Sequence, residues 1–538
     1  MEEGGAVEMS ADGSYELPKG WEWTTLANIA DIFSGNGFPK KYQGKSKGQI
    51  PFFKVMDISK TVLNGNIHLK IAGNYISFDE CEEIRAKPFK KGTIVFAKIG
   101  EAIKLNRRAI LGQDSLVDNN VMGITASSKE INNLFIFYFF LTVKLGDYSR
   151  ATAVPSVRKS DVELIAFPLP PYPEQRRIVT RIEELFTQLD AGISALKTSQ
   201  AQLKRYRQSV LKAAVEGKLT EKWRADHPDV EPASVLLERI GKERRAKWEE
   251  DELAKMVAKG KRPKNDRWKQ KYKAPQMPKT EGLPELPEGW TWVTSQMLSN
   301  FGPNSICAGP FGTIFKAKDF RSSGIPIIFL RHVSPGRYLT HKPTFMDKKK
   351  WYELFEPYSV YGGELLVTKL GEPPGVCAIY PIGIGPAMVT PDVIKISINE
   401  KISLPRFIMH YFNSDRSRKL ASGAAFGTTR LRLTLPIFRN MSIPLPPLSE
   451  QHEIVSEVER RLSVADQAEA TIATNLKRAA RLRQSILKKA FRGELVPQDT
   501  NDEPASILLE RIRAERAKSP PKKRRGRPRK NSGQKELI

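Results

Sequence analysis

The sequence predicts an α/β (α+β) protein made by internal duplication: two compact domains in tandem, separated by two long helices that form an antiparallel coiled coil with pseudo-twofold symmetry. Three observations predict this fold class. First, four sequence motifs occur twice in the same order. Second, apolar residues recur every seven positions after a Pro-rich motif. Third, β-rich segments bounded by glycines precede that motif. A chain of 538 residues also exceeds what one hydrophobic core supports.

The duplication is visible in four pairs of sequence motifs, which we also call phrases. They are ELPKGWEW (Glu16–Trp23) and ELPEGWTW (Glu285–Trp292); PLPPYPEQRRIV (Pro168–Val179) and PLPPLSEQHEIV (Pro444–Val455); RQSVLKAAVEGKL (Arg207–Leu219) and RQSILKKAFRGEL (Arg483–Leu495); and EPASVLLERI (Glu231–Ile240) and EPASILLERI (Glu503–Ile512). From the second pair to the end of the third, the two copies keep one offset of 276 positions, whereas the offset drifts within the segments before. The chain is therefore a variable block followed by a constant block, repeated once.

Each variable block is predicted to be a compact α/β domain. Segments such as GTIVFAKIG (Gly92–Gly100) and GELLVTKLG (Gly363–Gly371) have turn glycines around β-rich centres. Leu134–Leu145 reads as a helix or a buried strand, and Leu404–Ser414 as a helix packed on the sheet. Two domains of one design but different sequence suggest one task performed on two targets.

Each constant block is predicted to be a helix of about 43 residues that begins near Glu174 in the first copy and ends at a glycine, Gly217 or Gly493. A coiled-coil seam is predicted from the heptad positions Ile182, Leu189, Leu196, Leu203 and Val210, and from Val458, Ala465, Ile472, Ala479 and Ile486. The two helices pair with each other, or each packs on its own domain. The repeated decapeptide is expected to be a short helix that starts around Pro232–Ser234.

These features divide the chain into seven segments. They are an N-terminal extension (1–15), a first variable domain (16–171), a first helical region (172–240), a charged linker (241–283), a second variable domain (284–447), a second helical region (448–517) and a basic disordered tail (518–538). In the linker we expect a solvated helix that runs into a tether.

The charge of the chain indicates a polyanionic partner. Lys and Arg number 87 against 60 Asp and Glu, a net charge of +27, which favours nucleic acid. The three cysteines are far apart, so neither a disulfide framework nor a metal site is expected. No apolar run approaches a membrane span, and a cytoplasmic location is expected.

No catalytic motif is found in the sequence. GxGxxG after a strand and the Walker A motif are both missing, so the chain offers no methyl-donor or ATP pocket. Pro170–Tyr172 partly matches the NPPY element of amino-methyltransferases, but Leu169 stands where an acceptor side chain is needed. We therefore expect a binding protein without catalytic residues.

The opening LPxGW, the closing PLPPxxEQ and the RQS[IV]LKxA helix end, in duplicate and in this order, resemble the specificity subunit of type I restriction–modification enzymes over nearly the whole chain. The resemblance implies that the variable domains are target recognition domains, each reading one half of a split, asymmetric DNA target. It also implies that the helices set the spacing between the two halves. The implied partners are double-stranded DNA, two modification subunits that bind S-adenosylmethionine, and restriction subunits that use ATP and Mg. The long linker and the basic tail depart from the usual pattern.

Base-edge readout needs Arg, Lys, Asn or Gln on loops. The candidates are Lys98, Lys104, Asn106, Arg107, Arg108, Arg158 and Lys159 in the first domain, and Lys369, Arg430, Arg432 and Arg439 in the second. A phosphate contact or a solvated charge is the alternative for each. The sequence does not reveal the DNA target.

The tail contains RGRPR, the residues Arg525, Gly526, Arg527, Pro528 and Arg529, which resembles an AT-hook for the minor groove. The alternative is a basic tail that touches phosphates without specificity. For the whole chain, the alternative to a subunit of an enzyme complex is a stand-alone DNA-binding or antirestriction-like protein without enzyme partners.

Overall fold

The structure is a computed structural model that describes residues 15–149, 154–261, 263–310, 315–371, 373–424 and 431–518. The chain divides into two compact units. Unit 1 comprises Met1–Leu196 with Thr474–Ile538, and unit 2 comprises Lys197–Ala473. Each unit thus combines one variable domain with parts of both constant blocks, and each is described by itself.

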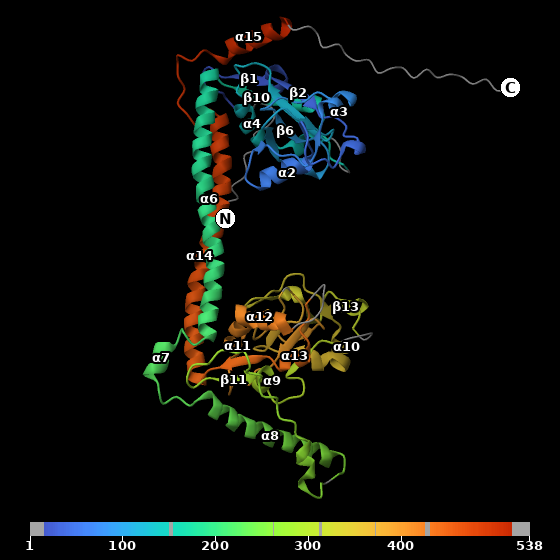
Figure 1. Cartoon of the computed structure of the whole chain (residues 1–538), viewed down its shortest axis with the longest axis vertical. Coiled ribbons are helices and arrows are strands. Elements are labelled where there is room, and N and C mark those ends of the chain that lie inside the picture. Colours follow the sequence, from blue (N-terminus) through green and yellow to red (C-terminus); the bar gives the residue numbers. More distant parts are fainter. Residues whose placement is uncertain are drawn as a thin grey trace, which may run out of the picture. The chain divides into compact units, whose positions relative to one another are not determined.

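Unit 1 contains the first domain, a mixed α/β fold (Figure 1). Its strands are β1 (Glu22–Thr25), β2 (Ala30–Ser34), β3 (Ile50–Phe53), β4 (His68–Leu69), β5 (Tyr75–Ile76), β6 (Ile94–Ala97), β7 (Arg108–Leu111), β8 (Leu116–Val117), β9 (Val121–Ala126) and β10 (Ala166–Leu169). Its helices are α1 (Leu26–Ile29), α2 (Val55–Leu63), α3 (Phe78–Glu83), α4 (Asn133–Thr142) and α5 (Lys159–Glu163). A five-stranded sheet has the order β2-β9-β6-β7-β4, a three-stranded sheet has the order β5-β3-β8, and β1 pairs with β10.

Strand β6 lies in the middle of the larger sheet and is buried on both faces, which explains its uninterrupted apolar sequence. Ile94 and Phe96 join the core that contains helix α4, whereas Val95 joins the core beneath α2. Leu134–Leu145 forms mainly the helix α4, which decides between the two readings of that segment.

Unit 2 contains the second domain. Its strands are β11 (Thr291–Thr294), β12 (Ile306–Ala308), β13 (Phe320–Arg321), β14 (Ile325–Ile328), β15 (Val333–Ser334), β16 (Arg337–Tyr338), β17 (Phe345–Met346), β18 (Ser359–Val360), β19 (Leu365–Thr368), β20 (Cys377–Ile379), β21 (Ala387–Val389), β22 (Val393–Ile396) and β23 (Ser442–Leu445). Its helices are α9 (Ser295–Leu298), α10 (Lys348–Lys350), α11 (Pro405–Asn413), α12 (Asp415–Ala424) and α13 (Leu435–Arg439). The sheets have the orders β12-β22-β19-β20 and β13-β17-β14-β21-β18, with the pairs β15-β16 and β11-β23. Strand β19 takes the central place that β6 has in the first domain, between β22 and β20.

The constant blocks form α6 (Tyr172–Val215) and α14 (Leu448–Phe491), helices of 44 residues each, or about 66 Å at ~1.5 Å per residue. Each is followed, two residues after its end, by a glycine with positive φ, +70° at Gly217 and +71° at Gly493. The amide of the following residue bonds five positions back: Lys218 N donates to Ala213 O at 2.9 Å, and Glu494 N to Lys489 O at 2.9 Å. This is a Schellman-type helix end, which needs a left-handed residue and therefore favours glycine.

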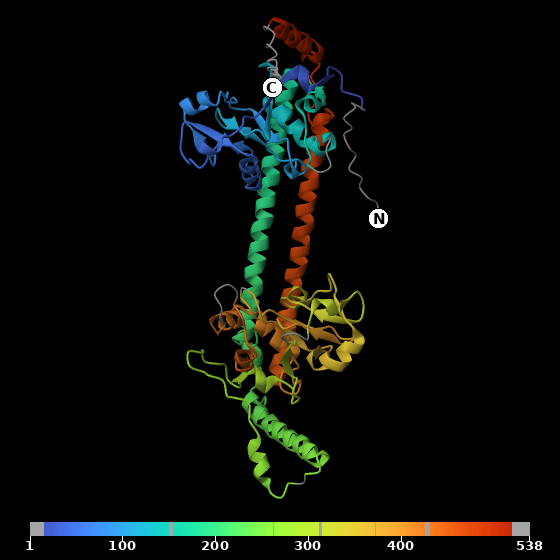
Figure 2. The same cartoon turned by 90° about the vertical axis from the view of Figure 1, so that its right-hand side faces the viewer.

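Within each unit, α6 and α14 pack against each other in opposite directions (Figures 1 and 2). In unit 1, Ile182 of α6 and Ile486 of α14 share one core, and Arg483 pairs with Asp190. In unit 2, Val210 and Val458 share one core. The equivalent ion pair there joins Arg207 Nη2 to Asp466 Oδ1 at 2.5 Å.

The burial of the ten heptad residues is uneven. Ile182, Val210, Val458, Ala465, Ile472, Ala479 and Ile486 are buried, whereas Leu189, Leu196 and Leu203 are half-buried. Knobs-into-holes packing along the whole helix length stays a prediction.

The decapeptides begin α8 (Ala233–Ala258) and α15 (Ala505–Lys518), and the short helix α7 (Glu221–Asp226) precedes α8. The first decapeptide is not a short helix as expected, because α8 continues for 26 residues into the linker. No proline stands between Pro232 and Pro263, and Gly241 alone does not stop a helix. Among the described residues, no helix is long and apolar enough to cross a membrane.

Candidate nucleic-acid interface

In the first domain, two segments far apart in sequence form one loop surface at the end of β6. Lys98 N donates to Asn120 O at 2.9 Å, and Lys98 O accepts from Val157 N at 2.9 Å. Ile99 and Ser156 form an isolated β-bridge. The structure therefore joins the loop after β6 to the segment before α5. We call residues 98–107 with 154–159 the β6 loop surface.

The β6 loop surface contains six of the seven residues predicted for this domain, and five of these six are cations. Lys104, Arg158 and Lys159 are exposed, whereas Lys98 and Arg107 are half-buried. Exposed ion pairs of Lys104 with Glu101 (3.0 Å) and of Lys159 with Glu163 (3.4 Å) contribute little stability, so both ammonium groups can exchange to phosphate. Ile99, Leu105 and Val154 are exposed apolar residues beside these cations. Cations mixed with apolar side chains suit contact with a nucleic acid.

Arg108 does not belong to this surface, although the sequence places it beside Arg107. Its side chain is buried, at 2% exposed, and its guanidinium lies 4.5 Å from the centroid of the Phe140 ring. Arg108 Nη1 and Nη2 donate to Asn106 O and Oδ1, both at 2.9 Å, and Nη2 also donates to Val143 O. Burial lowers the pKa of Arg108 to about 9. Arg108 is therefore an internal support and offers no donor to DNA.

Asn106, together with Arg108, holds the loop after β6 in place. It has a positive φ of +52°, a conformation that asparagine tolerates better than most residues. Its amide Nδ2 donates to Val143 O at 3.0 Å, and its Oδ1 accepts from Leu145 N at 3.3 Å as well as from Arg108. These bonds fix the end of the loop against the segment after α4. Asn106 thus positions the loop surface, with its side-chain oxygen and one amide hydrogen engaged inside the domain.

The second domain repeats the loop joint at the end of β19. Lys369 N donates to Asp392 O at 2.8 Å, Lys369 O accepts from Leu433 N at 2.8 Å, and Leu370 bridges Arg432. These bonds repeat those of Lys98 with Asn120 and Val157 in the first domain, with a lysine at the centre of both joints. We call residues 369–371 with 431–433 the β19 loop surface.

The predicted residues of the second domain have different environments. The Arg432 side chain is 45% exposed and lies 3.9 Å from the Asp392 carboxylate. Lys369 is buried, and its pKa is lowered mainly by this burial and to a smaller extent by the charge of Arg432. Arg439 is half-buried and donates to Ile306 O at 3.2 Å. Arg432 is therefore the exposed cation of the β19 loop surface. Arg430, and Arg525, Gly526, Arg527, Pro528 and Arg529 of the tail, lie outside the described residues.

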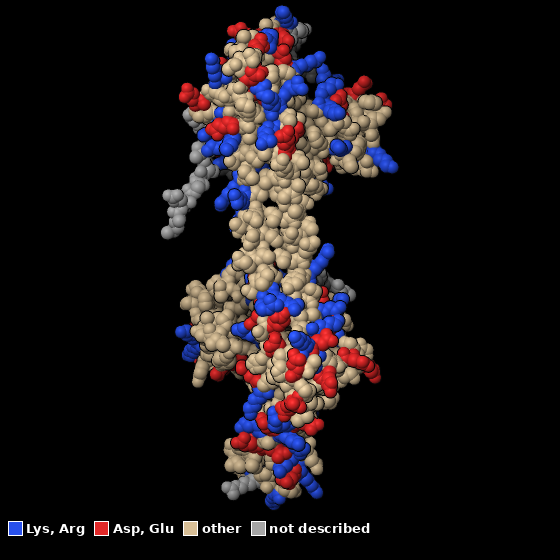
Figure 3. Space-filling view, turned by 90° about the vertical axis from the view of Figure 1, so that its left-hand side faces the viewer, with Lys and Arg blue, Asp and Glu red and all other residues tan. Residues whose placement is uncertain are grey.

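On the face that Figure 3 shows, charge alone does not mark an interface. On the face shown in Figure 3, Lys and Arg side chains are interspersed with Asp and Glu over the domains, and the central stretches of the long helices show few of either. The loop geometry, more than a patch of one sign, therefore identifies the candidate surface.

The phrases shared by the two copies join each domain to its helices. Trp21 Nε1 donates to Glu174 Oε2 at 3.0 Å, and Trp290 Nε1 donates to Glu450 Oε2 at 2.8 Å. The next residue, Gln175, accepts from Asn132 N at 2.9 Å and donates to Pro170 O at 3.1 Å. Thus the Trp of LPxGW and the Glu and Gln of PLPPxxEQ are structural joints. Their recurrence in both copies was the signal that could have identified them.

Two arginines beyond the decapeptides clamp the domains in the same way. Arg244 of α8 donates to the carbonyl oxygens of Gln296, Met297 and Ser299 around the end of α9. Arg516 of α15 donates to the carbonyl oxygens of Ala27 and Ala30 around the end of α1. A guanidinium satisfies several terminal carbonyls of a helix at once. The decapeptide helices therefore fasten the start of each domain, and in unit 1 the fastening element comes from the C-terminal part of the chain.

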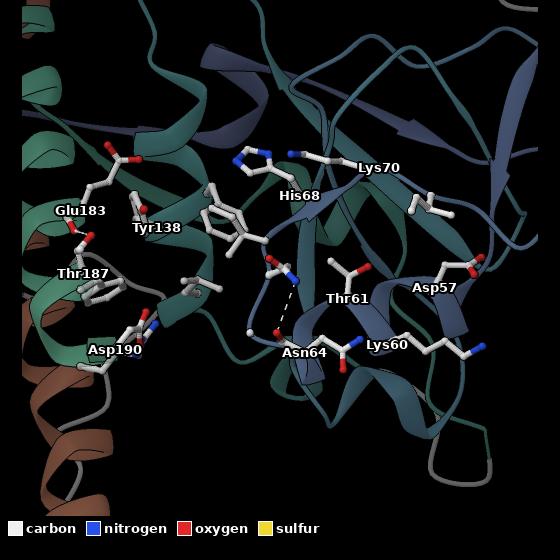
Figure 4. Close-up of a pocket in the computed structure, with 18 residues that line it drawn as sticks. Asp57, Lys60, Thr61, Asn64, His68, Lys70, Tyr138, Glu183, Thr187 and Asp190 are labelled. Atoms are coloured by element: carbon white, nitrogen blue, oxygen red, sulfur yellow. Dashed lines mark hydrogen bonds and ion pairs between the residues drawn. The ribbon is translucent and has the colours of Figure 1, made fainter. Parts of the chain in front are cut away.

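Unit 1 also has a cleft of about 860 Å³ between α2, β4, α4 and the long helices (Figure 4). Lys60, His68 and Lys70 lie on one wall, and Glu183 and Asp190 of α6 lie on the other. Each wall carries both signs of charge, because Asp57 lies on the same helix as Lys60 and Arg483 of α14 pairs with Asp190. This arrangement neither forms a catalytic constellation nor adds to the β6 loop surface.

Comparison with known proteins agrees with this architecture. Residues 18–205 and 334–478, more than half of the chain, match the family model described as the type I restriction modification DNA specificity domain. The type I restriction enzyme EcoBI specificity subunit of Escherichia coli is 25% identical over 536 residues, covering 96% of this chain and 97% of that protein. The EcoDI specificity subunit of Escherichia coli is 27% identical, covering 71% of this chain and 75% of that protein.

A solved structure described as "Structural basis underlying complex assembly and conformational transition of the type I R-M system" covers 89% of this chain and 100% of its own, with a TM-score of 0.58 and 18% identity. This likeness supports the fold. Together with the family match and the duplicated joints, it leads to one conclusion: the chain belongs to the family of type I restriction–modification DNA specificity subunits.

Proposed function

We propose that this chain is the DNA-specificity subunit of a type I restriction–modification complex and that its two domains read the two halves of an asymmetric, bipartite target. The observation that carries the proposal is the loop joint that occurs in both domains, at the ends of β6 and β19, with the same backbone bonds around a lysine and different side chains at the positions that surround it. A conserved geometry with exchanged side chains is what two readers of different sequences need. The curated relatives are named as specificity subunits, which supports the same role here.

In this proposal the chain has no catalysis of its own. Two modification subunits carry S-adenosylmethionine and methylate adenine, and restriction subunits use ATP and Mg for cleavage. The long helices α6 and α14 act as a spacer between the half-sites. We expect the purified chain to bind no S-adenosylmethionine and to methylate no DNA by itself.

The test is an exchange of residues 20–165 for the first domain of another family member. The hybrid is assembled with its modification subunits, and the methylated motif is read by methylome sequencing. One half of the motif is expected to change, while the other half and the spacer length remain. A change of both halves, or of neither, would contradict two independent readers.

A further inference from the structure

The two equivalent glutamates at the domain joints have different partners. Both side chains are buried, with Glu174 at 1% and Glu450 at 0% exposed. Glu450 accepts from Thr220 Oγ1 at 2.6 Å and from Arg224 Nη2 at 2.7 Å, in addition to its tryptophan. Glu174 Oε1 has no hydrogen-bond partner in the part of the chain that the structure describes. One copy therefore leaves half of a buried carboxylate unsatisfied.

The sequence after the helix end explains the difference. Thr220 and Arg224 follow Gly217 by three and seven positions, and Val496 and Thr500 stand at the same distances from Gly493. Valine offers no polar group, and the threonine side chain is much shorter than arginine. The second copy is also shorter here, because Glu231 follows Gly217 by 14 positions but Glu503 follows Gly493 by only 10. The segment that forms α7 and supplies Arg224 in the first copy is therefore truncated in the second.

A pocket of about 280 Å³ lies beside Glu174; we call it the Glu174 pocket. Its lining includes the ring of Trp21, the ammonium group of Lys19 and four carboxylates, those of Glu22, Glu174, Asp499 and Asp502. Asp502 is paired with Arg177 at 2.6 Å, so negative charge still exceeds positive charge around the pocket. This local excess of negative charge occurs in a chain with a net charge of +27. Burial raises the pKa of Glu174, since the ionised form is desolvated there. A bound cation would stabilise that ionised form.

Gln498 takes over only one of the two roles that Arg224 has in the other copy. Gln498 Nε2 donates to Gly493 O at 2.7 Å, just as Arg224 Nη2 donates to Gly217 O at 2.7 Å. Trp21, the charge of Arg177 and the Gln498 amide all lower the pKa of Glu174, but burial outweighs these effects. An amide brings no positive charge, so the helix-end carbonyl is satisfied while no cation of the described residues bonds the Glu174 carboxylate directly; Arg177, whose charge acts on Glu174, is paired with Asp502 at 2.6 Å.

We propose that the Glu174 pocket binds a guanidinium group from outside the chain, in the role that Arg224 has in the second domain. A guanidinium matches a carboxylate with a planar fork of donors and also packs on aromatic rings. Arg224 does both, since its guanidinium lies 5.8 Å from the centroid of the Trp290 ring while it bonds Glu450. Trp21 and Glu174 offer the same pair of groups. The guanidinium could be that of a free arginine-like metabolite or of an arginine side chain on another subunit.

The experiment uses the full chain labelled with 5-fluorotryptophan, with the Trp21 resonance assigned from Trp21→Phe. Methylguanidinium chloride is the probe, and methylammonium chloride at equal ionic strength is the control. We expect a saturable shift of the Trp21 resonance with methylguanidinium at millimolar concentration, and at least five-fold weaker binding of methylammonium. The Trp290 resonance should not respond, because Arg224 already occupies that site.

Two variants sharpen the test. Glu174→Gln should abolish the shift. The double variant Val496→Thr with Thr500→Arg transplants the partners of Glu450, and it should raise the melting temperature and block the probe. A wild-type chain without a saturable response, or a double variant that binds the probe as well as the wild type does, would overturn the proposal. This result is independent of DNA reading, because no DNA is present.

The source of the guanidinium is tested in the complex with the modification subunits. If a partner arginine fills the pocket, the assembled complex no longer responds to methylguanidinium, and Thr500→Arg weakens assembly at least ten-fold. If the natural ligand is a free molecule, the complex responds and the variant assembles normally. Either outcome retains the guanidinium site and identifies its occupant.

Discussion

Trp21 Nε1 donates a hydrogen bond to Glu174 Oε2 at 3.0 Å, and the two residues stand 153 positions apart. The bond ties the start of the first domain to the start of α6. Trp290 and Glu450 repeat it at 2.8 Å in the second copy. The most recognisable phrases of the chain are therefore held together by side-chain contacts, which explains why they recur while the domains between them diverge.

This joint predicts unequal effects of two matched substitutions. Trp21→Phe removes the indole donor and leaves Glu174 without the bond to Oε2, whereas after Trp290→Phe the carboxylate of Glu450 keeps Thr220 and Arg224. We expect Trp21→Phe to lower the stability of its domain by about 1–3 kcal/mol, and Trp290→Phe to have a smaller effect. Differential scanning calorimetry of the full chain measures both. The Trp21→Phe variant in a Glu174→Gln background controls for lost packing. If Trp21→Phe and Trp290→Phe lowered stability equally, the idea that Glu450 has more hydrogen-bond partners to fall back on than Glu174 would be refuted.

The β6 loop surface predicts which cations contact DNA. Arg158→Ala and Lys104→Ala should each weaken binding by the assembled methyltransferase and reduce the slope of log K against log salt by about 0.9 per lost phosphate contact. Lys90→Ala is the control, because Lys90 is an exposed cation that precedes β6 and pairs with Asp114 at 2.8 Å. A slope that falls equally in the control would remove the loop surface from the interface.

Arg108→Ala should behave differently from its neighbours. Its guanidinium holds Asn106 and the carbonyl of Val143, so its loss leaves buried acceptors without donors. We expect a loss of domain stability of about 1–3 kcal/mol, measured by calorimetry. The salt slope of the folded variant should remain that of the wild type. A lower slope with unchanged stability would place Arg108 in the interface instead.

His410 of α11 predicts a pH dependence of the second domain. Burial, followed by the charge of Arg406, lowers its pKa from 6.5 to about 4. The folded state therefore prefers neutral His410. The contribution of neutral His410 to the free energy of unfolding is fully present above pH 6.5 and is lost as the pH falls towards 4, because the unfolded chain takes up the proton first. The lost contribution is about 3 kcal/mol at ~1.4 kcal/mol per pKa unit. His410→Leu should lose less stability than the wild type between pH 7 and pH 4.5 in urea unfolding; parallel losses would show that other groups dominate.

The spacer role proposed for α6 and α14 predicts the spacing of the DNA half-sites. One extra heptad inserted after Leu196 and after Ile472 preserves the apolar register and adds about 10 Å at ~1.5 Å per residue. B-DNA rises about 3.4 Å per base pair, so the preferred gap should lengthen by roughly three base pairs, with lower affinity because the half-sites rotate on the duplex. Selection of spaced targets by the assembled methyltransferase reports the gap. An unchanged gap would favour helices that serve only their own domains.

The sequence by itself determined the duplication, the α/β character of both domains and the two long helices with their glycine ends. These features are local or periodic, and a left-handed residue at Gly217 or Gly493 is required whatever surrounds it. The sequence also determined the family, through the phrases that the family model matches.

Only the tertiary structure decided which cations are available at the candidate interface. Arg107 and Arg108 are adjacent in sequence, yet only Arg108 is buried, because β7 begins there and its neighbours come from the segment after α4. Lys98 and Arg158 belong to one surface because a backbone bond joins Lys98 to Val157 across the domain. Likewise, Glu174 Oε1 has no hydrogen-bond partner among the described residues, because Val496 and Thr500 stand where Thr220 and Arg224 stand in the other copy. The exposure of a side chain and its hydrogen-bond partners depend on segments that are distant in sequence, so a local sequence pattern does not predict them.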